Sequence, residues 1–145
     1  MHVEESQLKA FVLDSGLISQ ENLKKAEIEP KKTGNHVRDI LLNMGYIKEP
    51  ELKRLEAYIL GIPFVDLSET TIAPQVLHII PESIAQKNNI IAFKKTGKDL
   101  EVAMRDPDDI QTIEFIKKKE QGLRILPRIT TPESIQHALR QYQKS

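Results

Sequence analysis

The first 60 residues contain an internal repeat. Residues 13–18, Leu-Asp-Ser-Gly-Leu-Ile, align with residues 42–47, Leu-Asn-Met-Gly-Tyr-Ile, and aliphatic side chains follow both segments at matching distances. Apolar residues at helical spacing precede each glycine, which indicates an amphipathic helix that ends there. Gly16 and Gly45 suit this position, because glycine readily adopts the positive φ that commonly follows a helix. The repeat therefore predicts a helical subdomain, residues 1–61, built from a duplicated helix–Gly–helix hairpin.

Local signals divide this subdomain into helices. Ser19 is a good N-cap for the second helix. Pro30 and Gly34 are expected to break the chain after it, and Asn35 is expected to cap a third helix. A last helix is expected over residues 48–60. On the simplest interpretation the repeat is a scaffold, because glycines at helix ends with aliphatic neighbours are common packing chemistry.

Residues 62–80 are expected to form a linker. Pro63 and Pro74 interrupt this segment, and few of its residues recur at a helical or strand period. Because proline has no amide donor, Pro63 is not expected in the centre of a sheet. We expect an extended start over residues 64–67 and then a loop that connects two subdomains.

The remaining residues, 81–145, follow a different pattern. Pro-Glu-Ser-Ile occurs at residues 81–84 and again at 132–135. It suits the first turn of a helix, because proline is favoured at the first helical position. Asp106 and Thr131 are the expected N-caps of the two later helices. This half is therefore predicted to contain three helices.

Strands are predicted between these helices. Leu100, Val102 and Met104 alternate with other residues as in a half-buried strand. Gly97 lies in the turn of a hairpin before this strand, and Gly122 ends the helix after it. The order helix, strand, strand, helix, strand, helix predicts a hairpin followed by a right-handed crossover between parallel strands. We therefore predict an α+β fold, in which the helical subdomain precedes a small mixed sheet packed with helices.

The middle helix of this half is expected over residues 107–120. Ile110, Ile113 and Ile116 recur at helical spacing, so all three are predicted to face the core. The lysines at residues 117–119 suit the negative end of the helix dipole. No aromatic residues are interleaved with them as base stacking requires, so a solvated face is favoured over nucleic-acid binding.

Composition excludes several classes of function. The 145 residues carry 21 basic and 21 acidic side chains, so no net charge attracts nucleic acid or an anionic membrane. The lack of cysteine excludes disulfides, thiolate metal sites and cysteine nucleophiles. No apolar run reaches the ~18 residues of a membrane span, and the acidic start is unlike a signal peptide. We expect a soluble cytoplasmic domain with no nucleic-acid partner and no direct membrane insertion.

The sequence carries no recognisable catalytic or metal-binding motif. A Walker-type phosphate loop requires glycine, four residues and then Gly-Lys-Ser/Thr. The only Gly-Lys pair, Gly97-Lys98, has Ala92 and Asp99 at the two other diagnostic positions. The four histidines lack the spacing of a helical metal site. We expect no enzyme activity, no metal and no cofactor, and we assign no catalytic or metal-binding residue.

Five segments, taken in order along the chain, carry a resemblance to one protein family. They are residues 42–47 with Leu52, then 60–67, 80–85, 100–107 and 131–142. Together they resemble the MshEN-type N-terminal domain of the ATPases that power type II secretion and type IV pilus assembly. The resemblance spans about residues 6 to 143.

This resemblance implies a function without catalysis. The family domain has a helical part and a small α/β part, and it precedes a hexameric ATPase motor. It docks the motor to the cytoplasmic portion of an inner-membrane platform protein. The chain is thus expected to be cytoplasmic, peripheral to the inner membrane through its partners. It is expected to be an excised domain of such an ATPase or a stand-alone relative, and a stand-alone adaptor unrelated to motors is a further alternative.

The resemblance also implies a possible nucleotide ligand, because some members bind cyclic di-GMP through the duplicated helical motif. That motif has Arg-Leu-Gly at the helix start and a closing Gln. Arginine suits it because the guanidinium pairs with phosphate and stacks on guanine. Here residues 7–9 read Gln-Leu-Lys and residues 36–38 read His-Val-Arg, while Pro30 and Ile59 stand at the glutamine positions.

The motif therefore keeps its fold-forming glycines and loses its ligand-forming residues. Lys9 and Arg38 are basic but out of register, and a helix turns by about 100° per residue. We expect docking as the function, with cyclic di-GMP sensing as an alternative. If the nucleotide binds, the candidate ligand residues are Gln7, Lys9, Gly16, His36, Arg38 and Gly45.

Overall fold

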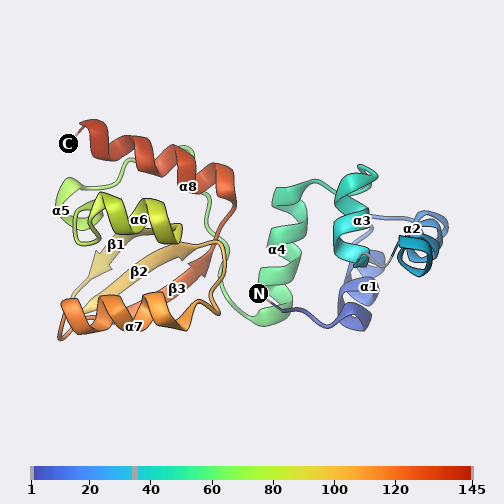
Figure 1. Ribbon diagram of the computed structural model, residues 1–145, viewed down its shortest axis with the longest axis horizontal. Helices are drawn as coiled ribbons and strands as arrows, with labels where there is room; N and C mark the ends of the chain where they lie inside the picture. The colour runs from blue at the N-terminus through green and yellow to red at the C-terminus, as the bar shows by residue number, and fades with distance from the viewer. Residues whose placement is uncertain (1, 34–35, 145) are drawn as a thin grey trace. The chain divides into compact units, whose positions relative to one another are not determined.

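The computed structural model describes residues 2–33 and 36–144, with side chains for all of these except residues 29–33. The chain divides into two compact units (Figure 1). We call the first, His2–Gly61, the helical unit, and the second, which begins at Ile62, the sheet unit. Each unit has its own hydrophobic core.

The duplicated hairpin forms the helical unit. Gly16 and Gly45 follow the first helix of each copy with φ of +74° and +76°, the conformation expected from the repeat. The hydroxyl of Ser19 accepts a 3.1 Å hydrogen bond from the amide of Asn22, so Ser19 caps the second helix as predicted. The described helices of this unit are α1 (Glu5–Asp14), α2 (Gln20–Thr33), α3 (Val37–Asn43) and α4 (Glu49–Leu60).

The break expected after the second helix is wrong in part. Helix α2 continues past Pro30 and ends at Thr33. A single proline removes one backbone hydrogen bond from this 14-residue helix, and it does not by itself fix a boundary. The predictions for Gly34 and Asn35 lie outside the described residues. Helix α3 begins after His36, which holds the N-cap position without a side-chain hydrogen bond.

A mixed three-stranded sheet in the order β1-β2-β3 forms the centre of the sheet unit. β1 (Ile90–Thr96) and β2 (Asp99–Met104) pair antiparallel. β2 continues through α7 (Ile110–Lys119) to β3 (Arg124–Ile129), which pairs parallel with it. The predicted α+β fold and its hairpin-then-crossover topology are confirmed. The other described helices are α5 (Pro74–Leu77), α6 (Glu82–Asn88), α8 (Pro132–Leu139) and the short 3₁₀ helix η1 (Arg140–Lys144).

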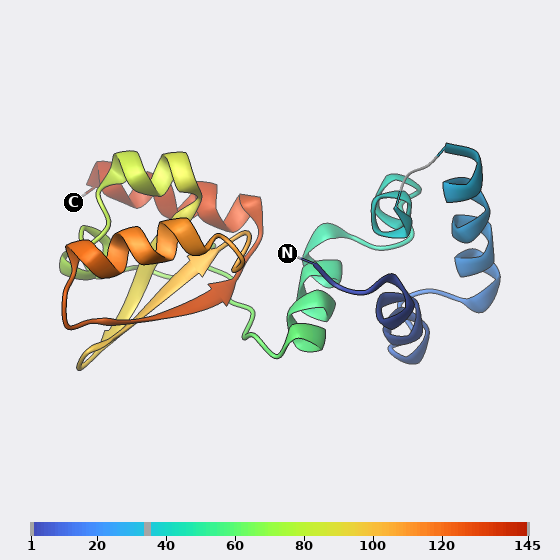
Figure 2. The same cartoon turned by 60° about the horizontal axis from the view of Figure 1, so that its bottom comes forward.

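The two faces of this sheet differ in chemistry. Leu100, Val102 and Met104 are buried, as their alternation predicted. They face α6, α7 and α8, which lie on one side of the sheet (Figure 2). Asp99 alternates with them and accepts two 2.8 Å hydrogen bonds from Arg124 of β3. The pKa of Asp99 is lowered because Arg124 bonds to its carboxylate. The other face of β2 thus carries cross-strand ion pairs at Asp99 and Glu101, whereas Ala103 on that face is buried.

The segment expected as a linker, residues 62–80, belongs to the sheet unit instead. Val65 donates a backbone hydrogen bond to Ile129, and Ile129 donates one to Pro63, each 2.9 Å long. These bonds add a short parallel bridge at Phe64 to the outer edge of β3. Further along, the segment contributes buried side chains to the core of the unit: Leu67, Ile72, Leu77 and Ile80.

Side chains from the C-terminal helix fasten this segment. The amide of Gln141 accepts a 2.8 Å hydrogen bond from the backbone of Ile72 and donates one of 2.7 Å to Thr70. The hydroxyl of Tyr142 points at two carbonyl oxygens, those of Ile80 at 2.7 Å and Leu77 at 3.1 Å. Burial, with a smaller effect of the nearby Glu82 charge, raises the pKa of Tyr142 to about 12. Thus residues 62–80 are held by partners 62 and 71 residues away in sequence.

Helix α7 starts later than expected. Its N-cap is Asp109, whose carboxylate accepts hydrogen bonds from the amide and hydroxyl of Thr112. Asp106, the predicted cap, instead accepts a 2.9 Å bond from the amide of Asp108 in the preceding turn. The late start leaves Ile110 in the first turn and 63% exposed, so its predicted burial is wrong. Thr131, by contrast, caps α8 as predicted by accepting a bond from Ser134.

Candidate functional site

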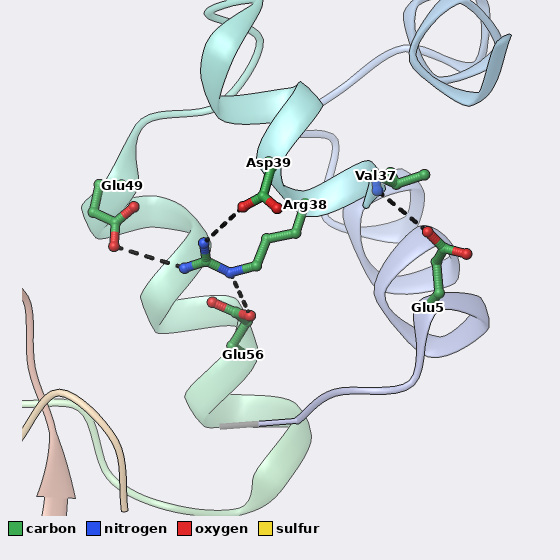
Figure 3. Close-up of polar contacts among 6 residues, drawn as sticks. All are labelled: Glu5, Val37, Arg38, Asp39, Glu49 and Glu56. Atoms are coloured by element: carbon green, nitrogen blue, oxygen red, sulfur yellow. Dashed lines mark hydrogen bonds and ion pairs between the residues drawn. The ribbon is translucent and has the colours of Figure 1, made fainter. Parts of the chain in front are cut away.

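The candidate ligand residues of the helical unit centre on an ion-pair cluster. The guanidinium of Arg38, on α3, donates a 2.9 Å hydrogen bond from Nε to Glu56 Oε2 on α4 (Figure 3). Glu49 of α4 lies 3.6 Å from the same guanidinium, and the neighbouring Asp39 lies 3.9 Å away. We call these four residues the Arg38 cluster. Three carboxylates of the chain itself therefore surround the one guanidinium.

Helix geometry explains how α4 supplies two of these carboxylates. Glu49 and Glu56 are seven residues apart, so two helical turns bring both side chains to the face that meets Arg38. Glu56 is only 2% exposed, whereas Glu49 lies at the rim of the cluster. Glu56 Oε1 has no hydrogen-bond partner among the described residues. Removal of Arg38 would therefore leave a buried carboxylate without its counter-ion.

The carboxylates around Arg38 stabilise its charged guanidinium. Burial by itself disfavours the guanidinium charge. The hydrogen bond and charge of Glu56 outweigh this effect, together with Glu49 and Asp39, so the pKa of Arg38 is raised. Because arginine is already protonated at every physiological pH, this shift does not make a pH switch. It means that the cation is held by internal partners.

A fourth internal carboxylate lies at the start of α3. Glu5 Oε1, from α1, accepts a 3.2 Å hydrogen bond from the backbone amide of Val37 (Figure 3). This bond joins the beginnings of the two repeat copies, which are 32 residues apart at these positions. It satisfies one of the amides that a helix leaves free at its first turn. Two groups of the second copy that could bind an anion are the guanidinium of Arg38 and the amide of Val37. Both already bind acidic side chains of the chain itself.

Three other candidate ligand residues lie on α1 or directly before α3. Gln7 and Lys9 lie on α1, where Gln7 is exposed and Lys9 is half-buried. Neither makes a hydrogen bond or ion pair with the Arg38 cluster within the described part of the chain. His36 is exposed at the position before α3.

Sequence reasoning missed the acidic residues Glu5, Glu49 and Glu56. A usable signal was present, because carboxylates at spacing seven on one helix share a face. That signal does not name the partner helix, so Arg38 could not be matched to them from the repeat alone. The sequence suggested Arg38 as a ligand residue, whereas the fold pairs it internally.

Residues 2–33 and 36–144 contain neither a metal-binding cluster nor a membrane-spanning helix. No group of three or more His, Cys, Asp or Glu side chains there is arranged to hold a metal ion. No helix among these residues is long and apolar enough to cross a membrane.

Comparison with known proteins identifies relatives over almost the whole chain. A type IV pilus assembly ATPase PilB from Myxococcus xanthus is 27% identical over 135 residues, which are 93% of this chain and 24% of that protein. The type IV pilus assembly ATPase PilB of Thermus thermophilus is 27% identical over 139 residues, 94% of this chain and 16% of that protein. The chain spans a quarter or less of these relatives' lengths.

Solved structures share the fold. A structure of MshE with cdg superimposes with a TM-score of 0.72 at 23% identity, covering 97% of this chain and 99% of that one. A structure of the N-terminal domain of XpsE has a TM-score of 0.59 at 16% identity, with 97% and 98% covered. The MshEN domain model matches residues 60–145, which include the described sheet unit. This chain therefore belongs to the MshEN domain family.

Proposed function

We propose that this chain is a non-catalytic docking domain of a secretion or type IV pilus ATPase. It connects the hexameric motor to the cytoplasmic part of an inner-membrane platform protein, and so works at the cytoplasmic side of that membrane. Support comes from the PilB relatives, which are pilus assembly ATPases, and from the fold shared with the XpsE N-terminal domain. The sequence offers no Walker motif or catalytic cluster that would suggest another role.

One observation favours docking over nucleotide sensing. Arg38, the best candidate in the second repeat copy to hold a phosphate, already has Glu56, Glu49 and Asp39 as partners. A phosphate would have to displace a 2.9 Å hydrogen bond to a buried carboxylate and would then face three negative charges at close range. Like charges at such distances are costly in a partly buried site.

Cyclic di-GMP sensing is the second candidate function. It is favoured by the TM-score of 0.72 with a structure of MshE with cdg, and by the positive φ retained at Gly16 and Gly45. A similarity at 23% identity concerns the fold alone, and the ligand-forming side chains differ as described above. We therefore rank this function below docking.

Isothermal titration calorimetry tests the docking function. The chain is titrated with the purified cytoplasmic part of the platform protein from the same secretion or pilus system. We expect saturable 1:1 binding, with a Kd of about 1–10 μM for an interface of modest size. An unrelated cytoplasmic domain of similar charge serves as the control. No heat above that control at about 100 μM platform protein would contradict the proposal.

A further inference from the structure

A groove separates α6 from α7 on the helical side of the sheet. α6 packs on β1 and α7 on β3, the two outer strands of the sheet (Figure 1). The cavity has a volume of about 310 Å³. The residues that line this α6–α7 groove are Ile84, Lys87 and Asn88 from α6, and Gln111, Thr112 and Phe115 from α7.

The walls of the groove are apolar at its centre. Phe115 is 46% exposed although it is a large aromatic side chain, and Ile84 opposite is only partly covered by the core beneath it. Single exposed apolar residues are common on protein surfaces and carry no meaning alone. Here an apolar residue from each helix lines the same concave site, where an apolar side chain of a partner could insert.

The rim of the groove is cationic. Lys87 lines the groove on the α6 wall. Lys119 is not a lining residue, but its ammonium lies 5.6 Å from the centroid of the Phe115 ring, which forms the α7 wall. Neither lysine has a carboxylate partner among the described residues, and no Asp or Glu lines the groove. The adjacent Lys117, by contrast, pairs with Glu114 at 3.6 Å. Charge complementarity therefore selects an acidic occupant.

We propose that the α6–α7 groove docks an acidic amphipathic helix of the platform protein. This inference rests on the proposed docking function and gives it a location and a partner chemistry. An apolar side chain of the partner inserts between Ile84 and Phe115, and its carboxylates meet Lys87 and Lys119. The ten residues of α7 span about 15 Å, which matches two to three turns of a bound helix.

A pair of designed peptides tests the chemistry of the groove in the whole chain. The first is a fluorescein-labelled 14-residue peptide with Leu at helical spacing and Glu elsewhere, and its twin has Lys in place of every Glu. Fluorescence anisotropy reports binding. We expect the acidic peptide to bind saturably and at least about tenfold more tightly than the basic twin. Equal affinity of the twins, or no binding of either, overturns the proposal.

Variants test the location. Lys87→Glu and Lys119→Glu should each weaken binding of the acidic peptide about tenfold or more, since each reverses one rim charge. Phe115→Ser should weaken it by removing the apolar wall. Lys98→Glu, an exposed lysine in the β1–β2 turn, makes the same charge change outside the groove and should alter affinity less than about twofold. All four positions are exposed, so melting curves should show that each variant folds. An equal loss with Lys98→Glu overturns the proposal, because the attraction is then general.

The same variants separate this proposal from the docking function on which it rests. If the platform protein binds the wild-type chain and loses affinity with Lys119→Glu but not Lys98→Glu, both proposals are supported. If it binds wild type and both variants equally, docking stands and the groove proposal is overturned. If it does not bind wild type at all, the docking function is contradicted and the platform protein is removed as the occupant.

Discussion

Arg38 and Glu56 join helices α3 and α4 through a 2.9 Å hydrogen bond between Nε and Oε2. The arginine side chain is 28% exposed and that of Glu56 only 3%, so one end of this pair is buried and the other reaches solvent. In a nucleotide site the guanidinium would have to point at the ligand. Here it joins the two helices of the second repeat copy, α3 and α4, to each other.

Loss of the cation should destabilise the helical unit. Arg38→Leu leaves the Glu56 carboxylate buried without its counter-ion, so we expect the free energy of unfolding to fall by about 3 kcal/mol. Urea denaturation followed by circular dichroism measures it. The double variant Arg38→Leu/Glu56→Leu should regain much of this loss, because an apolar pair needs no counter-ion. If Arg38→Leu alone were as stable as wild type, a stabilising role of the Arg38–Glu56 pair would be contradicted.

Glu49 provides a matched control within the same cluster. Its side chain is 37% exposed and 3.6 Å from the Arg38 guanidinium. Exposed ion pairs contribute little, so Glu49→Gln should cost less than about 1 kcal/mol in the same urea denaturation. If Glu49→Gln and Arg38→Leu cost the same, burial of Glu56 is not what makes the pair important.

Gly45 should be sensitive to substitution for a reason of backbone geometry alone. Its φ is +76°, and a Cβ added there meets no atom within 4 Å. The left-handed conformation costs a residue with a side chain about 1–2 kcal/mol, and a β-branched residue more. Gly45→Val should therefore lower thermal stability, and Gly45→Asn, which tolerates this conformation, should lower it less. Equal melting temperatures of the two variants would contradict this explanation.

The sequence predicted elements best where a local pattern decides them. The glycines after α1 and α3, the β1–β2 hairpin and the Thr131 cap each depend on a few neighbouring residues. The sequence did not show that residues 62–80 belong to the sheet unit. Their hydrogen-bond partners Ile129, Gln141 and Tyr142 are distant in sequence. A search for periodicity in the sequence cannot detect such long-range contacts.

The start of α7 shows a different limit. The sequence predicted Asp106 as the cap, and the structure has Asp109 in this role. Asp109 is the cap because its carboxylate reaches both the amide and the hydroxyl of Thr112. The partners of Arg38 could not be predicted for a related reason: the repeat places Arg38 at a helix start, but the carboxylates that it meets depend on how α3 packs against α4.

Tyr142 should make stability depend on alkaline pH. Its pKa is raised from 10.0 to about 12 because burial disfavours the phenolate. The folded state thus favours the protonated hydroxyl, so this stabilisation is complete below about pH 10 and is lost as pH rises towards about 12. Tyr142→Phe should lower the free energy of unfolding by about 1–3 kcal/mol at pH 8, since the carbonyls of Ile80 and Leu77 lose the one hydroxyl proton that they share.

The control for this prediction is Tyr58, which is 73% exposed on α4. Tyr58→Phe should leave both the stability at pH 8 and its alkaline pH dependence unchanged. Wild type and Tyr142→Phe should approach one another in stability between pH 10 and 12, as urea denaturation at several pH values would reveal. A constant difference across this range would be inconsistent with the buried hydroxyl.

Calorimetric titration of the chain with cyclic di-GMP tests most directly whether its repeat is a scaffold rather than a nucleotide sensor. The internal partners of Arg38, the side chain at Lys9 in place of a glycine, and Ile59 in place of a glutamine each remove binding energy. Losses of about 1–3 kcal/mol at each of these three positions weaken a micromolar site at least about a hundredfold. We therefore expect no saturable heat at about 10 μM nucleotide. Saturable binding at that concentration, abolished by Lys9→Ala or Arg38→Ala, would contradict this and make the chain a nucleotide sensor.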